Sequence, residues 1–203
     1  MRQFYCRFLL LISKNYDTIY AVIKLISVSF FEITGHTDLS GLNKLPESVR
    51  THCKKRESAA AALALTEMGI SHLQYEKSGK PIADNCFVSI SHSGSAVAVC
   101  KSDTPVGIDI EKIDRERNFE RIVKRFYHGE EVKNLFKNPS AEKFYEIWTK
   151  KEAYSKIFGG GLADIMNGFD VYSPDGVKFQ TYKINEYIIT VCEKIRKEDR
   201  SCT

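Results

Sequence analysis

The stretch "VGIDIEKI", residues 106–113, has the alternating pattern of a β-strand and carries two acids, Asp109 and Glu111, spaced two apart. Side chains of a strand point alternately to opposite faces, so the valine and isoleucines share one face and the two acids share the other. Neighbouring carboxylates repel each other unless a positive charge lies close to them. The stretch is therefore either an ordinary half-buried strand with a polar face, or one wall of a metal or catalytic site.

Length and composition indicate a folded protein. The chain has 203 residues, enough for one sizeable domain or two small ones, with 43% hydrophobic and 28% charged residues. Its net charge of +4 suits a polyphosphate or an acidic protein partner and is too small to indicate nucleic acid by itself. The six cysteines are scattered, without a C-x-x-C pair or zinc spacing, which favours reduced thiols in a cytoplasmic protein.

The N-terminal segment contains an apolar run at residues 8–12. This run is shorter than a membrane span or the core of a signal peptide, and charged residues interrupt any longer one. We therefore expect no membrane partner. Residues 1–20 are expected to be an extra segment of uncertain structure, followed by a first α+β half at 21–105 and a second at 106–203.

Local patterns in the first half predict strands and one long helix. β-branched and aromatic residues indicate a strand over 20–33, and a proline start, an alanine–leucine run and a glycine stop indicate a helix over 46–69. Two strands separated by small residues are expected within 87–102. Residues 96–101 are then expected to form an antiparallel hairpin with residues 106–112.

The second half repeats the combination of helices and strands. Helices are expected over 115–158, broken near Asn138 and Pro139. Three strands are expected within 169–195, with a tight turn at 174–176. The predicted class is therefore α+β, with mainly antiparallel sheets.

A second stretch that can carry chemistry is "WTKKEAYSKIFGGGL", residues 148–162. On a helix, Trp148, Glu152 and Lys156 lie four apart on one face, with Lys151 adjacent. An ordinary surface ion pair between Glu152 and Lys156 is one interpretation of this spacing. The three glycines in a row end the helix and allow the backbone to approach another group closely.

The third such stretch is "SISHSG", residues 89–94, which sets His92 between serines. The histidine is either a turn residue or one that places an imidazole, with the Ser91 hydroxyl, against a phosphate or a base. A nucleophilic Ser–His pair is disfavoured, because residues this close in sequence rarely assemble a triad and no G-x-S-x-G elbow exists.

Together these stretches predict a site for phosphoryl-group transfer. Asp109, Glu111 and Glu152 offer three carboxylates to a hard divalent ion such as Mg²⁺. The chain lacks a P-loop, a G-x-G-x-x-G motif and a kinase signature, so we expect positioning and charge neutralisation without a covalent nucleophile. Positive charge for phosphates is available from Lys54, Lys55, Arg56, Lys80, Lys151 and Lys156.

Five motifs resemble, in order and approximate spacing, those of the 4'-phosphopantetheinyl transferases: "GKP", "SISHSG", "VGIDIEKI", "FYHGEE" and "WTKKEAYSKIFGGGL". The likeness covers residues 44–171 and is strongest to the larger, pseudodimeric type that activates surfactin synthetase. It implies two similar halves related by a pseudo-twofold, with coenzyme A and Mg²⁺ between them. It also implies that a cytoplasmic monomer transfers the 4'-phosphopantetheine arm of coenzyme A to a serine of an apo acyl or peptidyl carrier protein, releasing adenosine 3',5'-bisphosphate.

The resemblance implies roles for the acids. Asp109, Glu111 and Glu152 would bind the metal, and Glu152 would also deprotonate the carrier serine. Glu131 of "FYHGEE" would assist catalysis, with Glu130 as the alternative. These assignments would explain why two carboxylates share one face of a strand.

The resemblance also implies contacts between basic or polar residues and coenzyme A. Lys156 would neutralise charge that develops on the phosphates. The helix "RESAAAALAL" departs from the family, because it has alanines where arginine and hydroxyl residues are usual. Arg56 is then either a coenzyme contact or part of a solvated basic face. The remaining coenzyme contacts implied are Lys80, Ser91, His92 and Lys151.

Two other functions remain as alternatives. A metal-dependent nuclease would show a (D/E)-x-K pattern on the acid-bearing strand, but Ile110 stands two residues before Lys112. A carrier-protein-binding relative that is catalytically weak would have lost acids or lysines from the site, and the candidate acids and lysines are present. The sequence therefore favours an active transferase.

Overall fold

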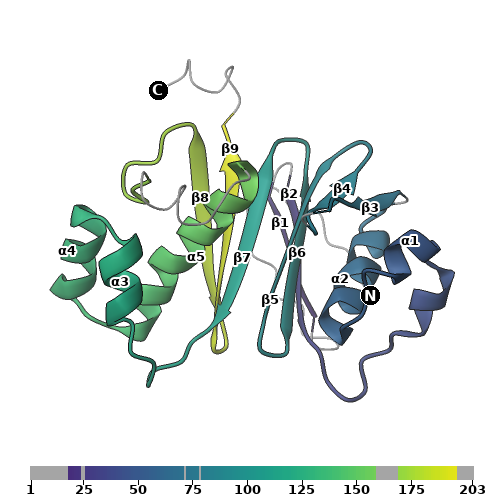
Figure 1. Ribbon diagram of the computed structural model, residues 1–203, viewed down its shortest axis with the longest axis horizontal. Helices are drawn as coiled ribbons and strands as arrows, with labels where there is room; N and C mark the ends of the chain where they lie inside the picture. The colour runs from purple at the N-terminus through teal and green to yellow at the C-terminus, as the bar shows by residue number, and fades with distance from the viewer. Residues whose placement is uncertain (1–17, 24–25, 71, 78, 159–168, 196–203) are drawn as a thin grey trace. The chain divides into compact units, whose positions relative to one another are not determined.

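The computed structural model describes residues 18–23, 26–70, 72–77, 79–158 and 169–195. The chain divides between Pro105 and Val106 into two compact units, the first unit before this point and the second unit after it. Each unit combines helices with antiparallel strands (Figure 1). The predicted α+β class with mainly antiparallel sheets is thus confirmed.

The first unit contains a four-stranded antiparallel sheet with the strand order β1-β2-β6-β5 and a two-stranded ribbon of β3 and β4. Its elements are β1 (Thr18–Ile23), β2 (Ile26–Glu32), the 3-10 helix η1 (Ser40–Lys44), α1 (Glu47–Arg50), α2 (Arg56–Glu67), β3 (Leu73–Tyr75), β4 (Pro81–Ala83), β5 (Phe87–Ser93) and β6 (Ala96–Ser102).

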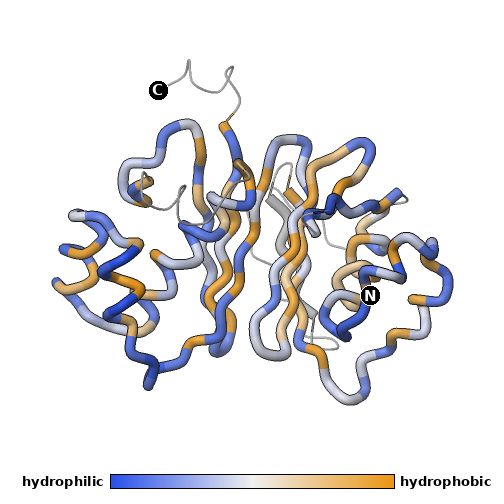
Figure 2. Tube along the Cα trace, viewed as in Figure 1, coloured by the Kyte–Doolittle hydropathy of each residue, from blue (hydrophilic) through white to orange (hydrophobic). Residues whose placement is uncertain are grey.

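The alanine-rich helix α2 covers this sheet. Small side chains allow a helix to approach a sheet closely, and Ala62 and Leu65 are completely buried in one core with Val97 and Val99 of β6. Figure 2 shows hydrophobic positions along β6 in agreement with this burial. The alanines of α2 therefore have a packing role.

Two expectations for the first unit were too simple. The strand expected over 20–33 is two strands, because β1 and β2 pair with each other as an antiparallel hairpin. The helix expected over 46–69 is divided into α1 and α2 by residues 51–55. The two strands expected within 87–102 are confirmed as the paired strands β5 and β6.

The second unit is a three-stranded antiparallel sheet with the order β7-β9-β8, and helix α5 lies against it. Helix α4 contacts α5, and Figure 1 shows α3 and α4 on the side of α5 away from β7. The break expected near Asn138 and Pro139 is confirmed, because α4 ends just before it. The elements are β7 (Val106–Lys112), α3 (Glu120–Phe126), α4 (Gly129–Lys137), α5 (Ala141–Phe158), β8 (Val177–Ile184) and β9 (Tyr187–Lys194).

The hairpin expected between residues 96–101 and 106–112 was wrong. β6 pairs with β2 along one edge and with β5 along the other, so neither edge is available to β7. β7 pairs instead with β9, which lies almost eighty residues further along the chain. The three strands expected within 169–195 are two, because the residues before β8 form a turn. The triple glycine at 159–161 lies outside the described residues.

The second unit is held by aromatic and branched side chains of α5 that pack on β9 and on the helices beside it. Phe144 and Ile147 of α5 share a core with Ile188 of β9 and Val123 of α3. Within the described ranges, no helix is both long and apolar enough to cross a membrane.

Candidate functional site

An ion pair between β7 and α5 is the centre of the candidate site. Lys156 Nζ lies 2.8 Å from Asp109 Oδ1 and donates a second hydrogen bond, of 2.7 Å, to the carbonyl oxygen of Ile108. The Asp109 residue is only 5% exposed, whereas the Lys156 side chain is 28% exposed. The strand with the two acids is therefore not half-solvated as one interpretation held, because Val106–Ile110 are all buried.

Gly107 explains how α5 comes so close to β7. A Cβ atom built at this glycine would lie 2.0 Å from the carbonyl oxygen of Ala153 and 3.2 Å from Cβ of Lys156. Real Cβ atoms do not approach other atoms so closely, so only glycine allows this packing. The glycine that shares a strand face with Asp109 and Glu111 thus allows α5 to bring its own side chains beside them.

Glu152 lies one turn before Lys156 on α5 and is electrostatically coupled to the same acids. Its pKa is raised to about 7, first by burial and then by the negative charges of Asp109 and Glu111, whereas Lys156 opposes the shift. A carboxyl with a pKa near neutrality exchanges a proton readily at physiological pH. Glu152 thus interacts electrostatically with both acids of β7 and with Lys156.

The donor chemistry of this group suits a hard cation. Three carboxylates with one nearby lysine leave an excess of negative charge, which adds to the effect of burial in raising the pKa of Glu152. Oxygen ligands of this kind are those that Mg²⁺ prefers. The described residues contain no group of three or more histidine, cysteine, aspartate or glutamate side chains already gathered closely enough to hold a metal.

The structure pairs Glu131 and Lys151 with each other in the interior of the second unit. Both side chains are 0% exposed, and Lys151 Nζ lies 2.9 Å from Glu131 Oε1. Burial lowers the pKa of Lys151, while Glu131 acts in the opposite direction. The alternative acid, Glu130, is on the surface and pairs with Lys133 at 2.6 Å.

The sequence-selected residues of the first unit lie at the ends of its elements. His92 is exposed near the end of β5, Ser91 beside it is buried, and Lys80 is exposed just before β4. Arg56 begins α2 and donates a hydrogen bond of 3.0 Å to the carbonyl oxygen of Thr34. These four residues belong to the first unit, whereas the acids and Lys156 belong to the second.

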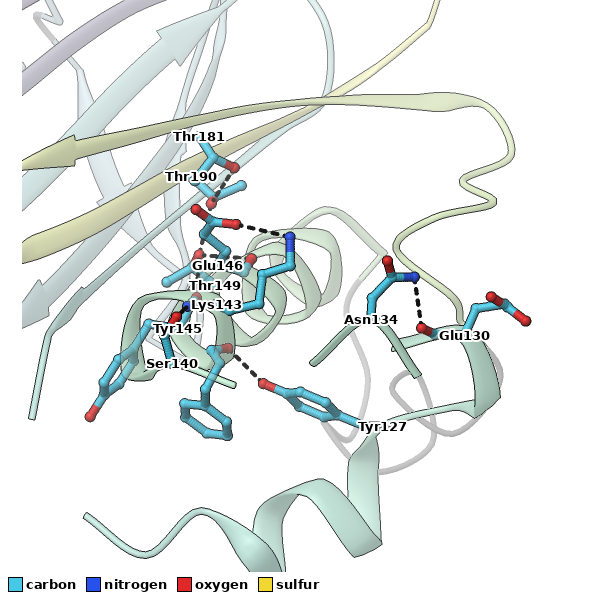
Figure 3. Close-up of polar contacts among 11 residues, drawn as sticks. Tyr127, Glu130, Asn134, Ser140, Lys143, Tyr145, Glu146, Thr149, Thr181 and Thr190 are labelled. Carbon is cyan, nitrogen blue, oxygen red and sulfur yellow. Dashed lines mark hydrogen bonds and ion pairs between the residues drawn. The ribbon is translucent and has the colours of Figure 1, made fainter. Parts of the chain in front are cut away.

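A chain of three threonine hydroxyl groups, two of them on fully buried residues, was not predicted from the sequence. Thr149 Oγ1 donates to the carbonyl oxygen of Tyr145 at 2.8 Å and lies 2.7 Å from Thr190 Oγ1, which lies 3.0 Å from Thr181 Oγ1 (Figure 3). Thr190 is the strand partner of Asp109 across β7 and β9. Helical spacing was the available signal, because Thr149 precedes Glu152 by three residues.

The fold and the site together define a class. A long helix is held tightly on an antiparallel sheet, and it sets a proton-exchanging carboxyl and a lysine beside a buried aspartate. Perturbed carboxyls with specific charge partners are typical of enzyme sites that move a proton or bind a cation. The second unit therefore carries a cluster of acids and a lysine of the kind that such sites contain.

Comparison with known proteins identifies the family. The model of the 4'-phosphopantetheinyl transferase superfamily matches residues 105–199, which include the described part of the second unit. A 4'-phosphopantetheinyl transferase of Bacillus subtilis is 33% identical over 156 residues, which cover 68% of this chain and 69% of that protein. This chain therefore belongs to the 4'-phosphopantetheinyl transferase superfamily, as the five motifs predict, and is an enzyme of that class.

Other relatives match shorter regions. The 4'-phosphopantetheinyl transferase gsp of Aneurinibacillus migulanus is 38% identical over 95 residues, 45% of this chain and 39% of that protein. The 4'-phosphopantetheinyl transferase Sfp of Bacillus subtilis strain 168 is 33% identical over 109 residues, 52% of this chain and 48% of that protein. The chain thus spans about half or less of the length of these two relatives.

Proposed function

We propose that this chain transfers the 4'-phosphopantetheine group of coenzyme A to a serine hydroxyl of an apo acyl or peptidyl carrier protein, with Mg²⁺ as cofactor. The other product is adenosine 3',5'-bisphosphate. Membership of the superfamily and the names of the curated relatives support the reaction class. The coupling of Glu152 to Asp109, Glu111 and Lys156 is the observation that carries the proposal for this chain.

In this proposal the three acids have two tasks. Asp109, Glu111 and Glu152 would hold Mg²⁺, which would neutralise charge on the pyrophosphate of coenzyme A. Glu152 also accepts the proton of the carrier serine, directly or through water. Its place one helical turn from Lys156, in electrostatic contact with Asp109, supports this role.

Lys156 stabilises the negative charge that develops as the bond between phosphorus and the leaving oxygen breaks. Its ammonium group is partly exposed while two hydrogen bonds to β7 hold it in place. A charge that is positioned before the reaction stabilises the transition state without reorganisation during the reaction. The serine oxygen attacks the phosphorus, and the bisphosphate departs from the opposite side.

Residues of the first unit are proposed to bind the coenzyme away from the reacting phosphorus. The exposed His92 contacts a phosphate with Ser91 beside it, and the exposed Lys80 approaches the nucleotide end. Arg56 is the weakest member of this set, because its guanidinium already donates a hydrogen bond to the Thr34 carbonyl. The enzyme is proposed to work as a monomer in the cytoplasm.

The proposal is tested by the intact mass of an apo acyl carrier protein and an apo peptidyl carrier protein after incubation with this enzyme, coenzyme A and Mg²⁺. The expected result is a gain of one phosphopantetheine on the preferred carrier, abolished by EDTA and by Glu152→Ala. Near-normal transfer by Glu152→Ala would contradict the assignment of that residue.

Titration of the enzyme with coenzyme A separates the ways in which transfer can fail. Coenzyme binding without transfer to either carrier would contradict the proposed acceptor. The absence of both binding and transfer would favour a catalytically weak carrier-binding relative, with the alanine-rich α2 as the place where coenzyme contacts have been lost.

A further inference from the structure

The buried ion pair of Glu131 and Lys151 joins three segments that are distant in sequence. Lys151 lies in the middle of α5, while Glu131 lies in the first turn of α4. Lys151 Nζ also donates a hydrogen bond of 2.6 Å to the carbonyl oxygen of Phe169, and Glu131 Oε1 accepts one of 2.9 Å from the amide of Val171. The pair thus links α4, α5 and the chain that leads into β8.

Glu131 has a further contact that fixes the start of its own helix. Its Oε2 atom accepts a hydrogen bond of 2.8 Å from the amide of His128, and the two residues form a capping box at the N-terminus of α4. Each carboxylate oxygen of Glu131 therefore has a defined partner. A buried pair that is satisfied in this way holds its segments in one arrangement, and the loss of either charge leaves the other uncompensated.

The position of Lys151 connects this arrangement to the reaction. Lys151 directly precedes Glu152 in α5, so the rotation of the helix that buries Lys151 also decides where Glu152 points. The chain at Phe169 is held to α5 a second time, because the rings of Phe169 and Tyr154 stack with centroids 3.6 Å apart. The pair is thus next to the catalytic turn but has no exposed surface of its own.

We propose that Glu131 and Lys151 are positioning residues, which hold the turn of α5 carrying Glu152 and Lys156 and do not themselves contact coenzyme A or the carrier serine. This inference rests on the proposed transferase function. Its basis is that both side chains are fully buried, pair with each other and bind backbone groups on both sides of the pair. A phosphate contact from Lys151 would require this network to open.

The test is a double-mutant cycle of Lys151→Met, Glu131→Gln and the double variant, with stability and transferase kinetics measured on each. Each single variant leaves one buried charge without its partner, so we expect a lower midpoint of unfolding and at least a tenfold loss of kcat, with the KM for coenzyme A little changed. The double variant removes both charges. We expect it to recover most of the stability and to return kcat to within about tenfold of the wild-type value.

A matched control is the exposed pair of Glu120 and Lys124 on α3, which has side chains 63% and 75% exposed. Glu120→Gln combined with Lys124→Met is expected to change neither stability nor kcat, because surface ion pairs contribute little.

The outcomes are distinguishable. A double variant that regains stability but stays more than a hundredfold below wild type in kcat would overturn the proposal, because the charges would then act on the substrate. Unchanged kcat in the folded single variants would also overturn it, because the pair would then be structural only. No transfer by the wild-type enzyme on either carrier would instead contradict the proposed function itself.

Discussion

Lys156 has a structural and a chemical task, and both depend on the same two hydrogen bonds to β7. Its ammonium group compensates the buried Asp109, so its removal leaves a carboxylate with little access to solvent. In Lys156→Met we expect kcat/KM to fall by about 10²–10³-fold. We also expect stability to fall by about 1–3 kcal/mol, the usual result when a buried group loses its partner. Urea unfolding and steady-state transfer assays measure the two effects, and loss of stability with full activity would contradict the chemical role.

The raised pKa of Glu152 predicts that the stability of the metal-free protein depends on pH. Its pKa of about 7 in the folded protein is above the ordinary 4.5, so the folded protein binds this proton more tightly than the unfolded chain. The contribution of this proton to the stability of the folded protein is complete below pH 4.5, the ordinary pKa, and is lost as the pH rises through about 7. In the presence of EDTA we therefore expect the free energy of unfolding of Glu152→Gln to exceed that of wild type by about 1–3 kcal/mol near pH 8. Near pH 4.5 we expect the two values to be equal.

Urea unfolding of both proteins across this pH range measures the difference. Glu186→Gln is a suitable control, because Glu186 is exposed on the same unit and its pKa is lowered by its hydrogen bond to Arg115. A gain in the free energy of unfolding of Glu152→Gln that did not increase with pH would contradict the raised pKa of Glu152.

At the scale of elements, α5 can lie close against β7 because Gly107 of β7 has no Cβ atom. In Gly107→Ala the new Cβ would overlap the backbone oxygen of Ala153, and a backbone carbonyl has no alternative rotamer with which to avoid it. Helix α5 must then move away from the sheet and take Glu152 and Lys156 with it. We expect a loss of at least about 2–3 kcal/mol in stability, together with most of the transferase activity.

Gly129→Ala provides a matched control for this substitution. The glycine begins α4, and a Cβ atom there would have nothing within 4 Å. We expect the Gly129→Ala protein to be as stable as wild type or slightly more stable, because alanine restricts the unfolded chain and favours helix formation. Thermal unfolding of both variants checks the comparison, and equal losses would show that the close approach at Gly107 is not the cause.

At the scale of the whole molecule, the proposed roles divide between the two units. The acids and Lys156 belong to the second unit, while His92 and Lys80 belong to the first. We therefore expect His92→Ala to raise the KM for coenzyme A by about tenfold, a typical value for one charge-assisted hydrogen bond, with kcat changed less. His36, which is also exposed in the first unit, is the control, and His36→Ala is expected to leave both constants unchanged. A fall in kcat alone for His92→Ala would place this residue at the reacting phosphorus.

Patterns between neighbouring residues predicted much of this fold. The alternation in residues 106–113 correctly indicated a strand, and the break near Pro139 correctly separated α4 from α5. The hairpin between residues 96–101 and 106–112 failed because a short turn shows only that two strands are consecutive. It does not show which edges are already paired, and β6 uses both of its edges within the first unit.

For the site, the sequence alone determined the residue types and the family. The two acids on one strand face and the helix with Glu152 and Lys156 four apart could be predicted because both periods are properties of the local backbone, and the family followed from five motifs in order. Only the tertiary structure decided the partners: Lys156 rather than Lys151 reaches Asp109, and Lys151 is buried with Glu131. The two lysines differ by five positions on one helix, and which of them faces the strand depends on how α5 rotates over Gly107 and on what covers its other side.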